Sequence, residues 1–149
     1  MTATYRLTAG RRIANALMRA ALWAGIAPRR YALLTVPGRR SGKPQSTPIM
    51  VLRRGGEGWL VAPYGARAWV KNARAAGQVT LSRGRRRATV PVEEVGPDEA
   101  GPVLKEYLRQ TPIARPFFDP APDGPLADFV REAPRHPVFR LGGSAKANR

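Results

Sequence analysis

Residues 36–48 read VPGRRSGKPQSTP and concentrate cations and turn-forming residues, with no acid among them. Two glycines bracket Arg39, Arg40 and Ser41, and Lys43 follows the second glycine. A glycine-punctuated turn can direct several N–H groups at one anion, and an Arg guanidinium offers a planar fork to phosphate or carboxylate. The stretch therefore predicts an anion-binding loop, and on these residues alone a basic hairpin loop in solvent is an equal alternative.

The loop does not fit the phosphate-binding P-loop. That motif needs four residues between its glycines and Ser or Thr after the Lys, whereas three residues separate Gly38 from Gly42 and Pro44 follows Lys43. Pro44 has no backbone N–H and would not begin the helix of that motif. Apolar runs on both sides, ALLTV and IMVL, indicate instead a loop that joins two strands.

A second cluster, APYGARAWVKNAR, combines aromatic and cationic side chains. Tyr64 and Trp69 are large aromatics, and Arg67, Lys71 and Asn72 lie beside them in the sequence. If this segment crosses the end of a sheet, it meets the cationic loop there. Aromatic walls with a cationic rim suit a flat ring that bears an anionic tail.

Composition excludes several kinds of site. There is no cysteine, so we expect neither disulfides nor thiolate metal ligands. His136 is the single histidine, which argues against a histidine-based metal centre and leaves little room for a Ser-His-Asp triad. We interpret it as a hydrogen-bonded surface residue. With no run of about 18 uncharged apolar residues and no signal-peptide core, we expect a cytoplasmic protein.

The net charge of +16 is distributed unevenly. Residues 1–90 carry 18 of the 26 Lys and Arg but only one acid, Glu57. A field of one sign attracts polyanions, which include nucleic acid, an anionic membrane and a phosphate-bearing or carboxylate-bearing ligand. An Arg-rich, solvated surface is the plain alternative. The N-terminal helix is a possible membrane-surface contact, but we favour its packing on the protein through the face of Ile13 and Leu17.

The hydrophobic pattern and the positions of Gly and Pro predict the elements. We expect helices over 9–27, 67–76, 98–110 and 126–132, and strands over 31–36, 47–53, 59–62, 79–83, 87–95 and 137–141. Hairpin-linked strands with helices outside them favour the α+β class with a small antiparallel β-barrel. We expect a single domain over 1–149, with an N-terminal helix in 1–30, a barrel core in 31–95, a helix, a proline-rich segment and a closing strand in 96–141, and a disordered tail in 142–149.

Residues 31–95 resemble a known family. The pattern LLTVPGRRSGKPQSTPIMVL, then WLVAP, then WVKNARAAGQVTL is similar to the deazaflavin-dependent nitroreductase family. The pieces GRRSGKP and W-x-x-N-x-x-A are its most specific parts, in this order and spacing. The resemblance implies a split antiparallel β-barrel that binds the deazaflavin coenzyme F420, and a reductase that transfers hydride from reduced F420 to a quinone, an activated alkene or a nitro compound.

The resemblance also implies roles for individual residues. By this resemblance, Arg39 and Arg40 bind the phosphate and carboxylate tail of F420. Ser41 and Gly42 donate hydrogen bonds to it. Gln45 stands where the family often has another Arg. The deazaflavin ring lies beside Pro48, and the short helix covers ring and tail with Trp69 and Asn72. The remaining cofactor-binding candidates on the same two segments are Lys43, Ala62, Pro63, Tyr64 and Lys71.

Some positions depart from the family pattern. Many members have a Ser-Lys pair after the third strand, where this chain has Pro63 and Tyr64, and the linker to Trp69 is shorter. Met50 stands where some members have an aromatic, which puts nitro reduction in doubt. Tyr64 is our first candidate for a catalytic proton donor, ahead of Tyr107 or water, and its packing on the barrel rim is an equal alternative.

Other functions remain open from the sequence. An FMN-binding relative of the same barrel is one, although FMN has no long acidic tail and leaves much of the basic surface unexplained. A nucleic-acid-binding module is another and draws on the five residues Arg83–Arg87, but few aromatics accompany them. We expect an anionic deazaflavin and a small electron acceptor as ligands, a homodimer as a possible assembly, and no nucleic-acid partner.

Overall fold

The structure, a computed structural model, describes residues 9–25 and 30–142. Its strands are β1 (Tyr31–Pro37), β2 (Pro44–Arg54), β3 (Glu57–Val61), β4 (Gln78–Arg83), β5 (Arg86–Glu94) and β6 (Val138–Leu141). Its α-helices are α1 (Ala9–Ala24), α2 (Ala68–Ala76), α3 (Pro97–Gln110) and α4 (Leu126–Glu132). Two short 3₁₀ helices, η1 (Pro112–Phe117) and η2 (Ala133–Arg135), flank α4.

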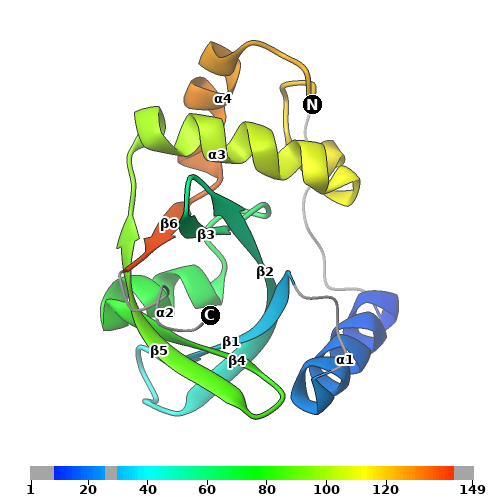
Figure 1. The fold of residues 1–149 in the computed structure, drawn as a ribbon, viewed down its shortest axis with the longest axis vertical. Coiled ribbons are helices and arrows are strands. Elements are labelled where there is room, and N and C mark those ends of the chain that lie inside the picture. The colour runs from blue at the N-terminus through cyan, green and yellow to red at the C-terminus, as the bar shows by residue number, and fades with distance from the viewer. Residues whose placement is uncertain (1–8, 26–29, 143–149) are drawn as a thin grey trace.

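The strands close into an antiparallel barrel in the order β1-β2-β3-β6-β5-β4 (Figure 1). In β1 the alternation of the strand buries Ala32, Leu34 and Val36 inside the barrel and leaves the residues between them half-buried. The C-terminal strand β6 completes the closure by pairing with both β3 and β5. The expected α+β class with a small antiparallel barrel is confirmed.

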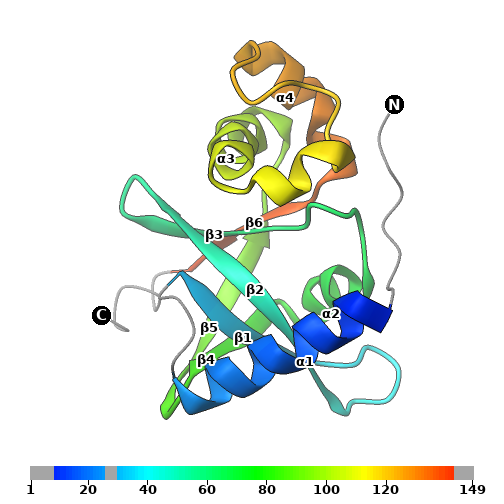
Figure 2. The same cartoon turned by 90° about the vertical axis from the view of Figure 1, so that its right-hand side faces the viewer.

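Two hydrophobic cores share β2 as their common wall. Ile49 and Val51 face the barrel interior, to which α2 adds Val70 and Ala73. Met50 and Leu52 face the opposite way, into a second core under α3. Figure 2 shows α3 and α4 stacked on one side of the barrel while α1 runs alongside β1 and β2. The expected inner face of α3 is confirmed, with Val103, Leu104, Tyr107 and Leu108 buried.

The cationic loop is shorter than the sequence predicts. β2 begins at Pro44 rather than Thr47, because β1 and β2 stay paired as far as Pro37 opposite Pro44. Only residues 38–43 are therefore left to form the turn. Pro48 lies within the strand, opposite Leu33, instead of near its start.

Helix α1 packs on the barrel with a face different from the one we expected. Ile13 and Leu17 are 63% and 66% exposed, and Leu22 is fully buried. The inward face consists instead of residues at helical spacing from Arg11 to Leu22, and the Leu22 carbonyl accepts a hydrogen bond from Gly84 N in the β4–β5 turn. The predicted end of this helix at Pro28 lies outside the described residues.

The proline-rich segment before β6 is compact. The predicted helix over 126–132 is confirmed as α4, and Phe117, Phe118 and Phe129 are all buried in the core beneath α3. The structure adds η1 and η2, which the sequence did not signal. Of the expected tail only Gly142 is described. Among the described helices none is long and apolar enough to cross a membrane.

Candidate functional site

The cationic loop and helix α2 meet through one buried amide. Asn72 on α2 is 1% exposed, and its Oδ1 accepts hydrogen bonds from the backbone N of Arg39 at 3.0 Å and from the Arg39 guanidinium at 2.9 Å. On the same side chain, Nδ2 donates to Gln45 Oε1 at 3.4 Å. The two segments that the sequence singled out are thus brought together, as the order of elements predicts.

Three of the six N–H groups of the loop, residues 38–43, donate within the loop itself. Gly38 N donates to Lys43 O, Gly42 N donates to Gly38 O, and Lys43 N donates to Ser41 Oγ. Gly42 has a φ of +73°, which favours glycine, and a Cβ on Gly38 would lie 2.8 Å from Ser41 Oγ. The Gly42 amide is therefore engaged within the loop and does not point outward as the anion-loop interpretation expects.

Four exposed cations surround this contact, namely Arg39, Arg40, Lys43 and Lys71. Within the described part of the chain none of them forms an ion pair, because every ion-paired carboxylate there lies between Glu93 and Glu132. Their charge is therefore uncompensated locally. Such a cluster attracts a ligand that carries several negative charges.

An aromatic and apolar region adjoins the cationic one along β2. Pro48 shares a face of this strand with Met50, since side chains alternate along a strand. Met50 lies opposite Tyr31 of β1 in the strand register. Tyr31 and Tyr64 both pack against the core that contains Met50.

Tyr64 lies in the turn after β3, beside two residues that the sequence did not single out. Its ring meets the Phe117 ring edge to face, with centroids 4.8 Å apart. The guanidinium of Arg11 lies 5.8 Å from the Tyr64 centroid and 5.9 Å from that of Phe117. Helix α1 therefore contributes a cation to this region, which no local sequence signal could show.

Tyr107, the second proton-donor candidate, is buried in the core beneath α3. Burial raises its pKa, and the neighbouring Tyr64 and Tyr31 raise it further. A weaker acid is a poorer proton donor at neutral pH. Between the two tyrosines, the geometry favours the half-buried Tyr64.

His136 is buried and not on the surface as the sequence suggested. It is 3% exposed, its Nδ1 lies 2.8 Å from the carbonyl O of Pro63, and its Nε2 lies 2.7 Å from Glu132 Oε2. Its ring stacks on Phe118 at 3.9 Å. The hint in the sequence was the i, i+4 spacing of Glu132 and His136, which is too common to single out a site.

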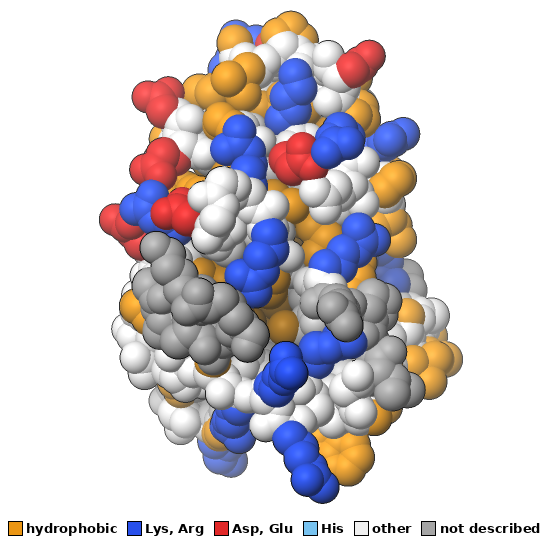
Figure 3. All heavy atoms as spheres, viewed as in Figure 1, with side chains coloured by type: hydrophobic (Ala, Val, Ile, Leu, Met, Phe, Trp, Pro, Cys, Tyr) orange, Lys and Arg blue, Asp and Glu red, His pale blue; other side chains and the backbone are white. Residues whose placement is uncertain are grey.

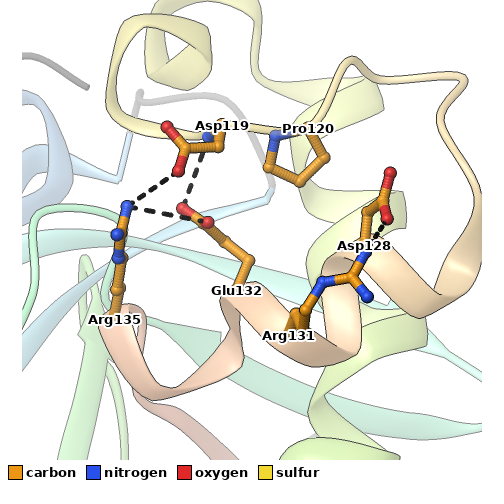
Figure 4. Close-up of a pocket in the computed structure, with 6 residues that line it drawn as sticks. All are labelled: Asp119, Pro120, Asp128, Arg131, Glu132 and Arg135. Atoms are coloured by element: carbon orange, nitrogen blue, oxygen red, sulfur yellow. Dashed lines mark hydrogen bonds and ion pairs between the residues drawn. The ribbon is translucent and has the colours of Figure 1, made fainter. Parts of the chain in front are cut away.

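One pocket of about 390 Å³ lies apart from these segments (Figure 4). Its lining is ionic and comes from α4, η2 and the segment before α4: Asp119, Pro120, Asp128, Arg131, Glu132 and Arg135. None of the predicted cofactor-binding residues lines it. The described residues contain no cluster of His, Cys, Asp and Glu that could hold a metal ion.

Comparison with known proteins agrees with this arrangement. Residues 2–114 match the model of a family described as F420H₂-dependent quinone reductase. The chain belongs to this family. It is therefore an F420H₂-dependent reductase with F420 as its cofactor, and the expected resemblance to the F420-binding barrel enzymes is confirmed. No curated protein matches the chain.

Several solved structures share the fold. An F420-H₂-dependent reductase, FDR-A, is 23% identical with a TM-score of 0.52, over 76% of this chain and 95% of that one. A protein described as a domain-swapped dimer is 20% identical with a TM-score of 0.55, over 89% and 96%. A NimC/NimA family protein from Clostridium acetobutylicum is 13% identical with a TM-score of 0.52, over 85% and 77%.

The residues present fit F420. The coenzyme combines a flat ring with a polyanionic tail, and the chain supplies four cations without acidic partners beside a region of proline, methionine and aromatic side chains. Hydride chemistry needs no protein nucleophile, since the cofactor supplies it. A chain without cysteine is compatible with a reaction in which the cofactor supplies the reactive group.

Proposed function

We propose that this chain binds reduced F420 across the contact between the cationic loop and α2 and passes hydride to a small or lipophilic quinone. The observation that carries the proposal is the double hydrogen bond from Arg39 to the buried Asn72. It fixes an uncompensated cationic loop against the helix that bears Trp69 and Lys71. A rigid cationic surface loses less entropy on binding a tail than a mobile one.

Each part of the site has its own task in this proposal. Arg39, Arg40, Lys43 and Lys71 bind the phosphate and carboxylates of the tail, with Ser41 Oγ and Gln45 as neutral partners. The ring lies against Pro48 and the segment Ala62–Tyr64, with Trp69 at its edge. When bound, F420H₂ supplies the hydride, so that the chain has only to orient the acceptor, exclude water and deliver a proton.

Tyr64 is the proposed proton donor. Two electrons reach a quinone with the hydride, and one further proton completes the quinol. Tyr64 is half-buried beside Phe117 and Arg11, so its side chain is partly accessible to solvent. Positive charge from Arg11 would also stabilise an oxyanion that develops on the acceptor.

A quinone is favoured over the other acceptors by the family description and by the apolar surroundings. Tyr31 and Tyr64 are partly buried against the apolar core that contains Met50 and Phe117, and the acceptor would approach on this side of β2. An activated alkene or a nitro compound is the second choice. Steady-state oxidation of F420H₂ with one member of each class ranks them, and a preference for the nitro compound would contradict the quinone proposal.

The first experiment is a titration of the protein with oxidised F420, followed by tryptophan fluorescence at two salt concentrations. Trp69 is the intended reporter, and a Trp23→Phe background removes emission from the 80% exposed Trp23. We expect saturable quenching at micromolar ligand that salt weakens. Arg39→Glu combined with Arg40→Glu should abolish it.

The matched control places the same charge change at the other end of β2. Arg53 and Arg54 are also adjacent and exposed, and Arg53→Glu with Arg54→Glu should leave most of the affinity. Equal losses in the two double variants would mean that the loop is not the binding site. Quenching by FMN but not by F420 would favour the FMN-binding alternative.

We also propose that α1 rests on an anionic membrane surface from which a lipophilic acceptor is taken. Ile13, Leu17 and Trp23 are 63%, 66% and 80% exposed, and Arg12 and Arg19 flank this apolar face. Apolar side chains with flanking arginines are typical of helices that lie in a headgroup region.

Co-sedimentation with vesicles tests the membrane proposal. We expect binding to phosphatidylglycerol-containing vesicles and little binding to phosphatidylcholine alone. Leu17→Glu should abolish it, while Leu126→Glu, on the exposed side of α4, should not. A protein that stays in the supernatant but loses a dimer on Leu17→Glu would instead identify a second copy as the partner of α1.

A further inference from the structure

The buried His136 has a hydrogen-bond partner at each ring nitrogen. Nδ1 faces the carbonyl O of Pro63 at 2.8 Å, and a carbonyl oxygen can only accept. Nδ1 must therefore carry a proton and donate it to Pro63. The protonation of Nδ1 thus follows from its hydrogen-bond partner.

The other nitrogen shares a second proton with Glu132. Nε2 lies 2.7 Å from Glu132 Oε2, and both side chains are almost completely buried. A neutral ring that donates through Nδ1 presents a bare Nε2, so a proton must lie between Nε2 and the carboxyl group. Whether the ring or the carboxyl group carries that proton, the contact with Glu132 is compatible with the proton that Nδ1 donates to Pro63.

Glu132 is itself held in place from the far side. Its Oε2 accepts a hydrogen bond from the backbone N of Asp119 at 3.4 Å, and Arg135 lies 3.9 Å from Oε1. Arg135 in turn pairs with the Asp119 carboxylate at 2.9 Å. Figure 4 shows these three side chains converging at one wall of the ionic pocket, while Arg131 pairs with Asp128 separately.

The target of this chain of contacts is the turn that follows β3, residues 62–65. Pro63 has no N–H, the turn is closed by Gly65 N to Ala62 O at 3.3 Å, and Ala62 N is bound to Pro137 O. The carbonyl that His136 holds belongs to the peptide bond directly before Tyr64. A rotation of that peptide would move the Tyr64 side chain, so the bond restrains the residue that the proposed reaction uses.

We propose that His136, held at Nε2 by Glu132, is a positioning residue that holds the Pro63–Tyr64 peptide in its working orientation. The assignment rests on the proposed function for the importance of Tyr64, but the restraint is a property of the protein without ligand. This restraint is geometric and requires no proton transfer from the pair of His136 and Glu132. The alternative is a buried pair that stabilises the fold as a whole and has no particular effect on Tyr64.

Three variants separate these two roles. His136→Phe keeps a ring to stack on Phe118 but removes both hydrogen bonds. His136→Asn restores a donor near the position of Nδ1. Glu132→Gln can place its NH₂ group toward Nε2, so that Nδ1 keeps its proton, at the expense of the hydrogen bond that Oε2 accepts from Asp119 N.

The first measurement uses the ligand-free protein and follows amide hydrogen exchange. We expect His136→Phe to speed exchange at Tyr64 and Gly65 by about tenfold or more, with Val51 in β2 unchanged as the internal reference. His136→Asn should recover part of the protection, and Glu132→Gln should resemble the wild type. Uniform acceleration that includes Val51, or no change at Gly65, would overturn the proposal.

The second measurement compares binding with turnover. We expect His136→Phe to change the dissociation constant for F420 less than threefold while kcat for quinone reduction falls on the order of tenfold or more, because a small misplacement near reacting atoms slows the chemistry. Equal losses in binding and kcat would contradict positioning. If the wild type does not bind F420, the proposed function fails, whereas the exchange result decides the restraint independently.

Discussion

At the scale of single residues, the site depends on the type of residue at position 72 of α2, whose side-chain oxygen accepts the hydrogen bonds of Arg39. Asn72 offers a neutral acceptor that leaves the positive charge of Arg39 available to a ligand. An acidic residue in its place would accept the same hydrogen bonds and neutralise that charge. The amide thus separates the structural task from the electrostatic one.

Asn72→Asp tests that separation. We expect the affinity for F420 to fall by about tenfold or more, since an added buried anion beside Arg39 repels a polyanionic tail. Thermal stability should be retained, because Oδ1 still accepts from Arg39. Isothermal titration measures the affinity and thermal unfolding measures the stability of the same samples. An unchanged affinity would mean that the tail of F420 binds elsewhere.

Tyr64→Phe removes the proposed proton donor and keeps the ring against Phe117. We expect kcat for quinone reduction to fall about 100-fold, the usual contribution of a positioned acid, with F420 affinity unchanged. Tyr107→Phe is the control, because its buried hydroxyl is the weaker acid. If Tyr64→Phe turns over at the wild-type rate, the proton comes from water.

The residue scale also shows what the sequence could and could not predict. The meeting of Arg39 and Asn72 followed from two short motifs and the order of elements. Arg11 and His136 did not, since their partners Tyr64 and Pro63 lie more than 50 and 70 positions away in the chain. A lone histidine beside a proline resembles a surface residue until the fold buries it.

At the scale of elements, the packing of α3 on α4 depends on a glycine. A Cβ at Gly101 would lie 2.6 Å from Val130 Cγ2 and 3.2 Å from Val130 N. The absence of a side chain there allows the two helices to approach closely.

Gly101→Ala sets two effects against each other. The gain in helix propensity is about 1 kcal/mol, and overpacking against backbone costs about 1–3 kcal/mol. We expect a net destabilisation, measured by urea unfolding. Gly96→Ala is the control, because a Cβ there meets no heavy atom within 4 Å. A stabilised Gly101→Ala variant would mean that α4 shifts freely.

The orientation of α1 could not be inferred from its pattern. Its most regular apolar stripe, with Ile13 and Leu17, faces outward, and the inward face is mixed. Hydrophobic periodicity gives the existence of an amphipathic helix but not which surface its apolar side meets. Here the contacts of Arg19 with Ser46 O and of Leu22 O with Gly84 N fix the helix on the barrel.

At the scale of the whole molecule, stability and charge can be tested together in alkaline solution. Burial raises the pKa of Tyr107 above its unfolded value of about 10. At pH values well below about 10, Tyr107 is protonated in both the folded and the unfolded chain, so it does not make the free energy of unfolding depend on pH. Above that value the unfolded chain loses the proton first, so the free energy of unfolding falls as pH rises.

We therefore expect the fall in stability between pH 9 and 11 to be steeper for the wild type than for Tyr107→Phe. Urea unfolding at a series of pH values measures the slopes, and the difference between the two proteins removes the shared titration of lysines and other tyrosines. Parallel slopes would show that Tyr107 ionises as readily in the folded protein as in the unfolded chain.

The uneven charge of the chain becomes a spatial asymmetry in the fold. On the face drawn in Figure 3 the acidic side chains lie in the upper part, around α3, whereas Lys and Arg are spread over both the upper and the lower parts. Ion pairs such as Arg74 with Glu94 and Arg140 with Glu99 cancel charge near the acids. The molecule therefore has a permanent electric dipole along its length. In the field of a polyanion it experiences a torque while still at a distance, and it turns its barrel end forward before any contact is made.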